Sequence, residues 1–201
     1  MPYLCIREND RATVSAATPP PQTTDNIHTP RDTQEKIMKK TLLAYGSSTG
    51  TCETIAKTIA GKLGVEAVNV ADIDADMVAD AENLILGTST WGAGEVQDDW
   101  YDALDLLKDA DLSGKTVALF GCGDCESYCD TFCGGMGEIY NALQDKGATF
   151  IGAVDASDYN YDDSEAVVDG KFVGLALDDV NESDKTEERI DAWVEAIKSS
   201  L

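Results

Sequence analysis

Hydroxyl, glycine and thiol residues gather in one short segment that lies between an apolar run and a stretch with helical spacing. Its candidate residues are Ser47, Ser48, Thr49, Gly50, Thr51 and Cys52. Backbone N–H groups at a helix start bind anions, and neighbouring hydroxyls add neutral donors, so this segment predicts a phosphate site. It has no Lys and lacks the spacing of nucleoside-triphosphate and dinucleotide loops. A phosphomonoester therefore fits best, and an ordinary capped helix start is the alternative reading.

A second segment brings a tryptophan out of an apolar strand and into a stretch of small residues. Its candidate residues are Ser89, Thr90, Trp91, Gly92, Ala93 and Gly94. An indole in such a loop can cover a flat aromatic ligand. The alternative is that Trp91 folds onto the adjacent helix.

A third segment is rich in cysteine. Its candidate residues are Cys122, Gly123, Asp124, Tyr128, Cys129, Asp130, Thr131 and Cys133, with Cys125 among them. Four thiols at this spacing suggest an iron–sulfur or zinc site as one hypothesis. The spacing matches no standard cluster run, however, and the acidic residues between the cysteines oppose thiolate charge. We therefore expect no metal here.

Apolar runs that alternate with helical periodicity indicate how these segments are positioned. Strands are expected at 41–45, 65–70, 83–88 and 116–120, with a fifth apolar run divided into 149–154 and 172–177. Helices are expected at 52–63, 98–108, 132–146 and 187–199, the last with Asp184 as N-cap. Such alternation predicts an α/β fold with a doubly wound parallel sheet, because parallel neighbours need helical crossovers. Ligands bind at the carboxyl ends of such strands, where the loops after strands one, three and four contain the candidate residues.

Composition restricts the functional classes further. The chain has 201 residues and a formal net charge of −23, which disfavours nucleic-acid and anionic-membrane partners. No apolar run is long enough to span a bilayer.

Residues 1–37 contain all five prolines, so we expect a disordered extension there and a folded domain at 38–201. A transit peptide is a weaker alternative for the extension. The cysteines are expected to be free thiols in a reducing cytoplasm.

The three segments together resemble the flavin-binding loops of the flavodoxin family. Ser47, Thr49 and Gly50 match the family's phosphate-binding pattern, whereas Cys52 stands where the family has its final threonine. A thiol is the weaker donor. Trp91 and Tyr128 correspond to the residues that cover the two faces of the flavin ring, and the Gly92–Ala93 peptide falls where the family's backbone faces the flavin nitrogen N5. The interrupted fifth strand resembles that of long-chain flavodoxins.

The resemblance implies a five-stranded sheet of order 2-1-3-4-5, with an insertion at 155–171 interrupting the fifth strand. It further implies one noncovalently bound FMN and a role as a low-potential one-electron carrier rather than an enzyme. An FMN-dependent NAD(P)H or quinone oxidoreductase, and a flavin-free interaction module, are the alternatives. Acidic segments at 91–102, 122–133 and 155–163 predict transient contact with redox proteins that carry basic docking surfaces. We expect a monomer.

Overall fold

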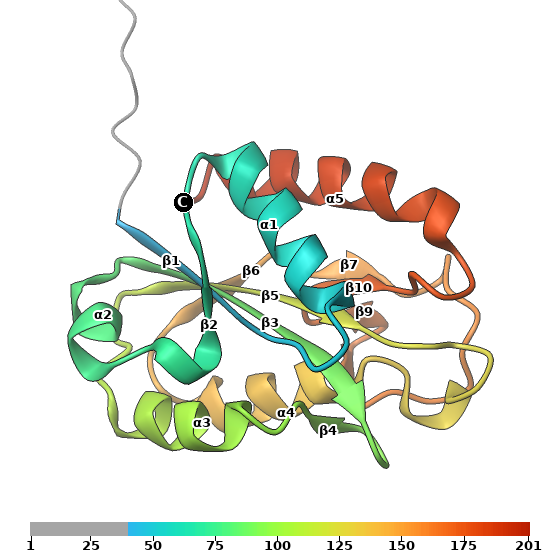
Figure 1. The fold of residues 1–201 in the computed structure, drawn as a ribbon, viewed down its shortest axis with the longest axis horizontal. Helices are drawn as coiled ribbons and strands as arrows, with labels where there is room; N and C mark the ends of the chain where they lie inside the picture. Colours follow the sequence, from blue (N-terminus) through green and yellow to red (C-terminus); the bar gives the residue numbers. More distant parts are fainter. Residues whose placement is uncertain (1–39) are drawn as a thin grey trace, which may run out of the picture. The chain divides into compact units, whose positions relative to one another are not determined.

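Alternating apolar strands and amphipathic helices build a parallel sheet with helices on both faces (Figure 1). The computed structural model describes residues 40–201, so the predicted extension at 1–37 and the boundary at 38 lie outside the described residues. The main strands are β1 (Thr41–Gly46), β2 (Ala67–Asn69), β3 (Asn83–Trp91), β5 (Thr116–Cys122), β6 (Thr149–Ile151) and β10 (Leu175–Leu177). The helices are α1 (Thr51–Leu63), α2 (Ala75–Asp80), α3 (Trp100–Asp109), α4 (Gly134–Leu143) and α5 (Ser183–Lys198).

The sheet runs β2-β1-β3-β5, and both β6 and β10 pair in parallel with β5. β6 lies beside the first half of β5, and β10 lies beside the second half, with Leu177 opposite Cys122. These two segments therefore share the fifth position, which confirms the order 2-1-3-4-5 and the interrupted fifth strand. The insertion between them forms a small antiparallel sheet of β7 (Val154–Asp155), β9 (Lys171–Phe172) and β8 (Val167–Val168).

Two apolar layers hold the helices against the sheet. α1 and α5 cover one face, and α2, α3 and α4 lie on the other (Figure 1). Successive residues of β3 alternate between these layers: Ile85 packs toward α1 and α5, whereas Leu84 and Leu86 pack toward α3 and α4. All three are fully buried, as expected for a strand that is covered on both sides.

Several element boundaries differ from the predicted ones. β3 continues to Trp91, which was expected in a loop, because Trp91 pairs with Glu95 of the short antiparallel strand β4 (Glu95–Val96). α4 begins at Gly134 rather than at 132, since Cys133 adopts a left-handed conformation with φ of 54°. The short helix α2 was not predicted, and Asp74 caps it by accepting the Met77 N–H at 2.8 Å.

The predicted N-cap of the last helix was wrong. α5 begins at Ser183, so Asp184 lies inside its first turn and Glu182 occupies the cap position. Asp184 there lies beside the positive end of the helix dipole, where an acidic residue is favourable without capping. None of the helices within residues 40–201 combines the length and apolar character needed to cross a membrane.

Candidate functional site

The loop between β1 and α1 presents an open helix start. Gly50 is the N-cap residue with φ of 92°, and no side chain in the described part of the chain caps the helix. The Ser47 hydroxyl oxygen instead accepts the Gly50 N–H at 3.2 Å, which shapes the turn before the helix. First-turn N–H groups without caps, beside the hydroxyls of Thr49 and Thr51, form an environment suited to an anion.

Cys52 contributes to this loop differently from a threonine. Its side chain is fully buried in the apolar layer beneath α1 and lies beside the thiol of Cys122. Hydrogen bonding with Cys122, together with burial, raises the pKa of the Cys52 thiol well above its usual value. The thiol is therefore protonated and faces the protein interior. A ligand at this loop would be bound by the backbone N–H of Cys52 rather than by its side chain.

The end of β3 holds the tryptophan in a defined orientation. Trp91 is 41 % exposed, and its indole Nε1 donates a hydrogen bond to the Ser89 hydroxyl oxygen at 2.9 Å. After it, Gly92 turns the chain with φ of 54°, and the Ala93 N–H donates to the Glu95 carboxylate at 2.5 Å. The Thr90 hydroxyl oxygen is buried and has no hydrogen-bond partner among the described residues.

Asp124 organises the loop after β5. Its carboxylate accepts the N–H groups of Glu126 and Ser127 at 3.2 and 2.9 Å, and the side-chain amide of Asn181 at 2.9 Å. The bonds from Ser127 and Asn181 hold the pKa of Asp124 below its ordinary value. The loop in this way presents Tyr128, which is 60 % exposed.

These three segments meet in one cleft of about 230 Å³ at the carboxyl ends of the strands. The predicted residues that line it are Thr49, Thr51, Ser89, Thr90, Trp91, Gly92, Cys122, Gly123, Asp124, Tyr128 and Thr131. The other predicted residues lie around these but outside the lining: Ser47, Ser48, Gly50, Cys52, Ala93, Gly94, Cys129, Asp130 and Cys133. The lining therefore combines hydroxyls at the start of α1 with the two exposed aromatic side chains Trp91 and Tyr128.

Three lining residues were not predicted: Phe132, Asp179 and Val180. Phe132 was assigned to the start of a helix that in fact begins two residues later. Asp179 and Val180 follow β10, at the carboxyl end of the fifth strand position. The rule that ligands lie beyond carboxyl ends applies to that strand as well, so the sequence contained a signal for them.

Within residues 40–201, the four cysteines of the third segment do not bring their sulfurs together as one group of metal-ligand atoms. The Cys133 thiol donates to the carbonyl oxygen of Gly121 at 3.6 Å, whereas the Cys125 thiol contacts the Asp178 carboxylate. Burial and that carboxylate raise the pKa of Cys125 to about 12. These two sulfurs thus interact with different groups, a carbonyl oxygen and a carboxylate. In a four-thiolate cluster the sulfurs would instead all point at one metal position.

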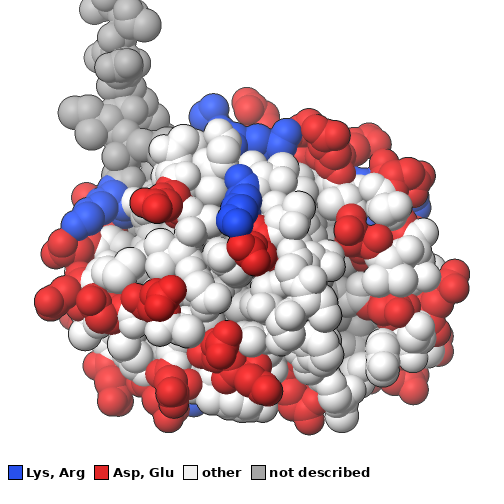
Figure 2. Space-filling view, in the orientation of Figure 1, with Lys and Arg blue, Asp and Glu red and all other residues white. Residues whose placement is uncertain are grey.

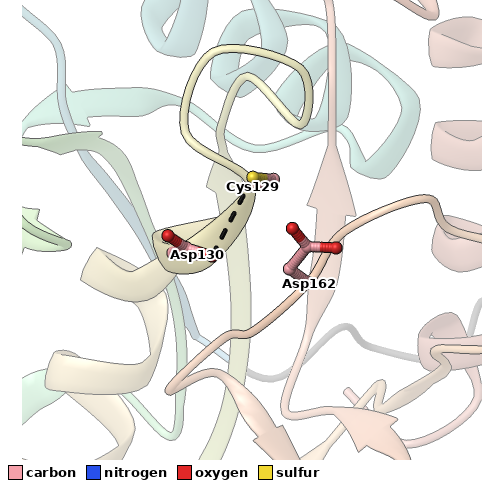
Figure 3. A group of neighbouring side chains, drawn as sticks. All are labelled: Cys129, Asp130 and Asp162. Carbon is pink, nitrogen blue, oxygen red and sulfur yellow. Dashed lines mark hydrogen bonds between the residues drawn. The ribbon is translucent and has the colours of Figure 1, made fainter.

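Cys129 instead lies between two carboxylates. Its thiol is 3.9 Å from Oδ1 of Asp130, and the ligand atoms of Cys129, Asp130 and Asp162 all lie within 4.8 Å of one another (Figure 3). Hydrogen bonding with Asp162 raises the pKa of the Cys129 thiol, and the two Asp side chains are exposed. The contact mainly ties the third segment to the insertion, since the N–H groups of Asp162 and Asp163 both donate to the Cys129 carbonyl.

A doubly wound sheet with an open helix start and two exposed aromatic residues at its switch point is typical of the mononucleotide-binding class of α/β proteins. A flavodoxin family model matches residues 43–193. The flavodoxin of Picosynechococcus sp. is 41 % identical over 168 residues, covering 82 % of this chain and 99 % of its own. Flavodoxin 1 of Azotobacter vinelandii is 40 % identical over 171 residues, covering 82 % of this chain and 98 % of its own.

Solved structures agree with the sequence relatives. A Fusobacterium nucleatum flavodoxin, crystallised with bound flavin mononucleotide, superposes with a TM-score of 0.77 at 32 % identity. The match covers 82 % of this chain and 99 % of that chain. The chain belongs to the flavodoxin family.

Proposed function

We propose that this protein binds one FMN noncovalently in the cleft and carries single electrons between oxidoreductases. The observation that carries the proposal is the shared cleft, in which an open helix start and two exposed aromatic side chains line one cavity. Family membership and the FMN-bound relative support the same cofactor. FMN supplies the one-electron chemistry when bound, and the protein orients and tunes it.

The donors in the cleft fit the phosphate of FMN. Neutral hydroxyls of Thr49 and Thr51 belong to the start of α1, where no described side chain caps the helix. Helix N-termini favour anions through their free N–H groups and the helix dipole. Within residues 40–201, the Thr90 hydroxyl has no hydrogen-bond partner, and it gives the cleft a buried polar atom that a polar ligand group can satisfy. We propose all the predicted loop residues as the FMN site, with Phe132, Asp179 and Val180 added.

The ring of FMN would lie against Trp91 and Tyr128. Both side chains line the cleft and are largely exposed without a ligand, 41 % and 60 %. Stacking an aromatic ligand against them removes that apolar area from water. The Gly92–Ala93 peptide is positioned beside this ring end, where Gly92 already has a positive φ that carries no Cβ penalty.

Acidic residues around the cleft oppose added negative charge on the flavin. One carboxylate about 10 Å away costs about 0.4 kcal/mol in a water-like medium, and several add to this after screening. Asp124 and Asp179 line the cleft, and Glu95 of β4 pairs with the lining residue Trp91. The second electron is therefore expected at a lower potential than the first.

The family favours a carrier over the oxidoreductase alternative. A carrier needs no acid, base or nucleophile, and the groups with perturbed pKa at this site are structural: Asp124 accepts loop N–H groups, and Cys125 is a buried thiol. The alternative is tested by NAD(P)H consumption without any reductase present, which a carrier does not support.

Transient redox partners follow from the family, and we propose that they present basic docking surfaces. In Figure 2 acidic side chains form patches around the rim and the lower half of the face, whereas many of the visible basic ones gather over α1 and near the start of β1. Opposite charges steer encounter while leaving contact short-lived, and binding should weaken with salt. We propose a monomer, since electron transfer requires an accessible ring edge.

We also propose the domain boundary and the compartment. The relatives align over 82 % of this chain while covering nearly all of their own length, which supports a flavodoxin domain at 38–201 and a separate extension at 1–37. Five described cysteines are free thiols, which supports a reducing compartment, the cytoplasm.

Titration of the apoprotein with FMN tests the proposal directly. We expect saturation at one FMN per chain, with quenching of flavin fluorescence as the ring stacks on aromatic side chains. Riboflavin, which lacks the phosphate, should bind more weakly because the start of α1 then has no anion. A protein that takes up no FMN, or that binds riboflavin equally well, would contradict the assignment of cofactor and phosphate loop.

A further inference from the structure

A buried carboxylate directly precedes two lining residues of the cleft in sequence but is not part of the lining itself. Asp178 follows the last residue of β10 and is only 1 % exposed. A carboxylate without water around it is unfavourable unless several donors satisfy it. The donors around Asp178 therefore indicate what this residue holds in place.

Asp178 accepts hydrogen bonds from two separate segments. Its Oδ2 accepts the Cys125 N–H at 2.9 Å, which belongs to the loop after β5. Its Oδ1 accepts the N–H groups of Val180 and Asn181 at 3.1 and 2.9 Å, which belong to its own turn. One side chain thus fastens the loop after β5 to the turn after β10.

Asn181 adds a second link between the same two segments. Its side-chain Nδ2 donates to Oδ2 of Asp178 at 2.8 Å and to Oδ1 of Asp124 at 2.9 Å. Asp124 in turn orders the loop that presents Tyr128, through the N–H groups of Glu126 and Ser127. A single amide therefore connects the buried carboxylate to the residue that shapes the aromatic loop.

Both fastened segments form walls of the cleft. Asp124 and Tyr128 line it from the loop after β5, and Asp179 and Val180 line it from the turn after β10. We propose that Asp178 and Asn181 are positioning residues that set how these two walls stand around the flavin ring. The inference rests on the proposed function, because it concerns the ring end of the FMN site.

The negative charge of Asp178 suits this task. Burial raises its pKa, but hydrogen bonds from Cys125 and Asn181 outweigh burial and leave the pKa below its ordinary value. The group is therefore ionised and acceptor-only at neutral pH. An asparagine at this position would turn one acceptor atom into a donor that faces other donors, and would loosen one of the two walls.

The experiment compares FMN binding and redox potentials in Asp178→Asn, Asn181→Ala and a control. Asp184→Asn makes the same charge change as Asp178→Asn on an exposed residue of α5 outside the cleft. Asn181→Ala leaves the charge unchanged and alters an exposed residue, so it remains informative if Asp178→Asn fails to fold. Each variant is first checked by thermal unfolding of the apoprotein.

We expect weaker FMN binding, by about tenfold for Asp178→Asn and about threefold for Asn181→Ala, with the control within about twofold of the parent. Asn181→Ala should also alter the visible circular dichroism of bound FMN. It should shift the one-electron potentials, where a threefold change in relative affinity is ~28 mV at 59 mV per tenfold. A residue needed for folding alone would lower stability and leave both flavin readouts unchanged.

The inference is overturned if folded Asn181→Ala matches the parent in FMN affinity, circular dichroism and potentials. It is also overturned if Asp184→Asn produces the same changes as Asp178→Asn, because net charge would then explain them. Failure of the parent protein to bind FMN would instead refute the proposed function, so the two failures are distinguishable.

Discussion

The indole N–H of Trp91 donates to the hydroxyl oxygen of Ser89 at 2.9 Å, and both residues line the cleft. This bond joins Trp91, the last residue of β3, to a residue two positions earlier on the same strand. It restricts the rotation of a side chain that is otherwise 41 % exposed. The ring is in this way held ready for a ligand before one binds.

Ser89→Ala should weaken FMN binding by about two- to fivefold, because a hydrogen bond worth about 1 kcal/mol no longer orients the indole. The dissociation constant is measured by flavin fluorescence. Ser113→Ala, an exposed serine before β5 at the other end of the sheet, is the control and should behave like the parent. Equal affinity in Ser89→Ala and the parent would show that the bond has no role in binding.

Trp91→Ala should weaken FMN binding by about tenfold, since stacking of an aromatic base on an aromatic side chain is worth about 1–3 kcal/mol. Trp91→Phe should recover most of the affinity because a ring is retained. Tyr101→Ala removes a 50 % exposed aromatic residue that does not line the cleft, and should have no effect. Isothermal calorimetry provides the comparison, and a loss of affinity in Tyr101→Ala as large as in Trp91→Ala would count against stacking.

Gly92→Ala should alter the separation between the two one-electron potentials of bound FMN. Gly92 has φ of 54°, and a Cβ built there would meet the Glu95 carboxylate oxygen at 2.2 Å. An L-residue in this conformation costs about 1–2 kcal/mol, so the Gly92–Ala93 peptide, which we propose faces the ring, is held less readily in its present orientation.

Gly61→Ala is the matched control for this change. Gly61 lies within α1 with open space around its Cα, so alanine should stabilise the protein by about 0.5–1 kcal/mol and leave the potentials unchanged. Potentiometric titration of the Gly92→Ala and Gly61→Ala holoproteins compares their one-electron potentials with those of the parent. Equal potentials in Gly92→Ala and the parent would show that Gly92 has no role in setting the potentials of the bound flavin.

Acid should remove the contribution of Asp178 to stability. Its folded-state pKa lies below its ordinary value, so between these two values the unfolded chain binds more protons than the folded one. The stabilisation is fully present above the unfolded value of about 3.9 and is lost as the pH falls through the folded pKa. Asp178→Asn should therefore be less stable than the parent at neutral pH, by about 1–3 kcal/mol, and the gap should close below about pH 4.

Urea unfolding of the two apoproteins between about pH 3 and pH 7 measures this gap. The exposed-residue variant Asp184→Asn should show a smaller gap to the parent at neutral pH, of about 0.3–1 kcal/mol, because it loses only a favourable charge in the first turn of α5. A gap that stays constant or widens as the pH falls would contradict a depressed pKa at Asp178.

The parallel sheet and the three loops at its carboxyl end could be predicted from the sequence because they depend on strongly periodic apolar runs, whereas the strand order was implied by the resemblance to flavodoxins. Leu84, Ile85 and Leu86 make such a run, and their burial on both faces is what a central strand requires. The division of the fifth strand could also be predicted, because the sequence has two apolar runs with a polar segment between them. In the structure these runs form β6 and β10.

Contacts between distant segments could not be predicted in the same way. Asp178 appeared in the sequence as one acidic residue among many, and only folding brings Cys125, 53 positions earlier, to its carboxylate. The start of α4 was misplaced for a local reason, because a non-glycine residue in the left-handed conformation, Cys133, has no clear sequence signal. Hence Phe132 was assigned to a helix although it lines the cleft.

Stepwise reduction of the purified holoprotein, followed by visible absorbance against electrode potential, tests the central claim most directly. A flavin that is held between Trp91 and Tyr128 and tuned for single electrons should accept them in two resolved steps, the second at the lower potential. Uptake of both electrons in one unresolved step, or a protein that holds no flavin, would contradict a one-electron carrier.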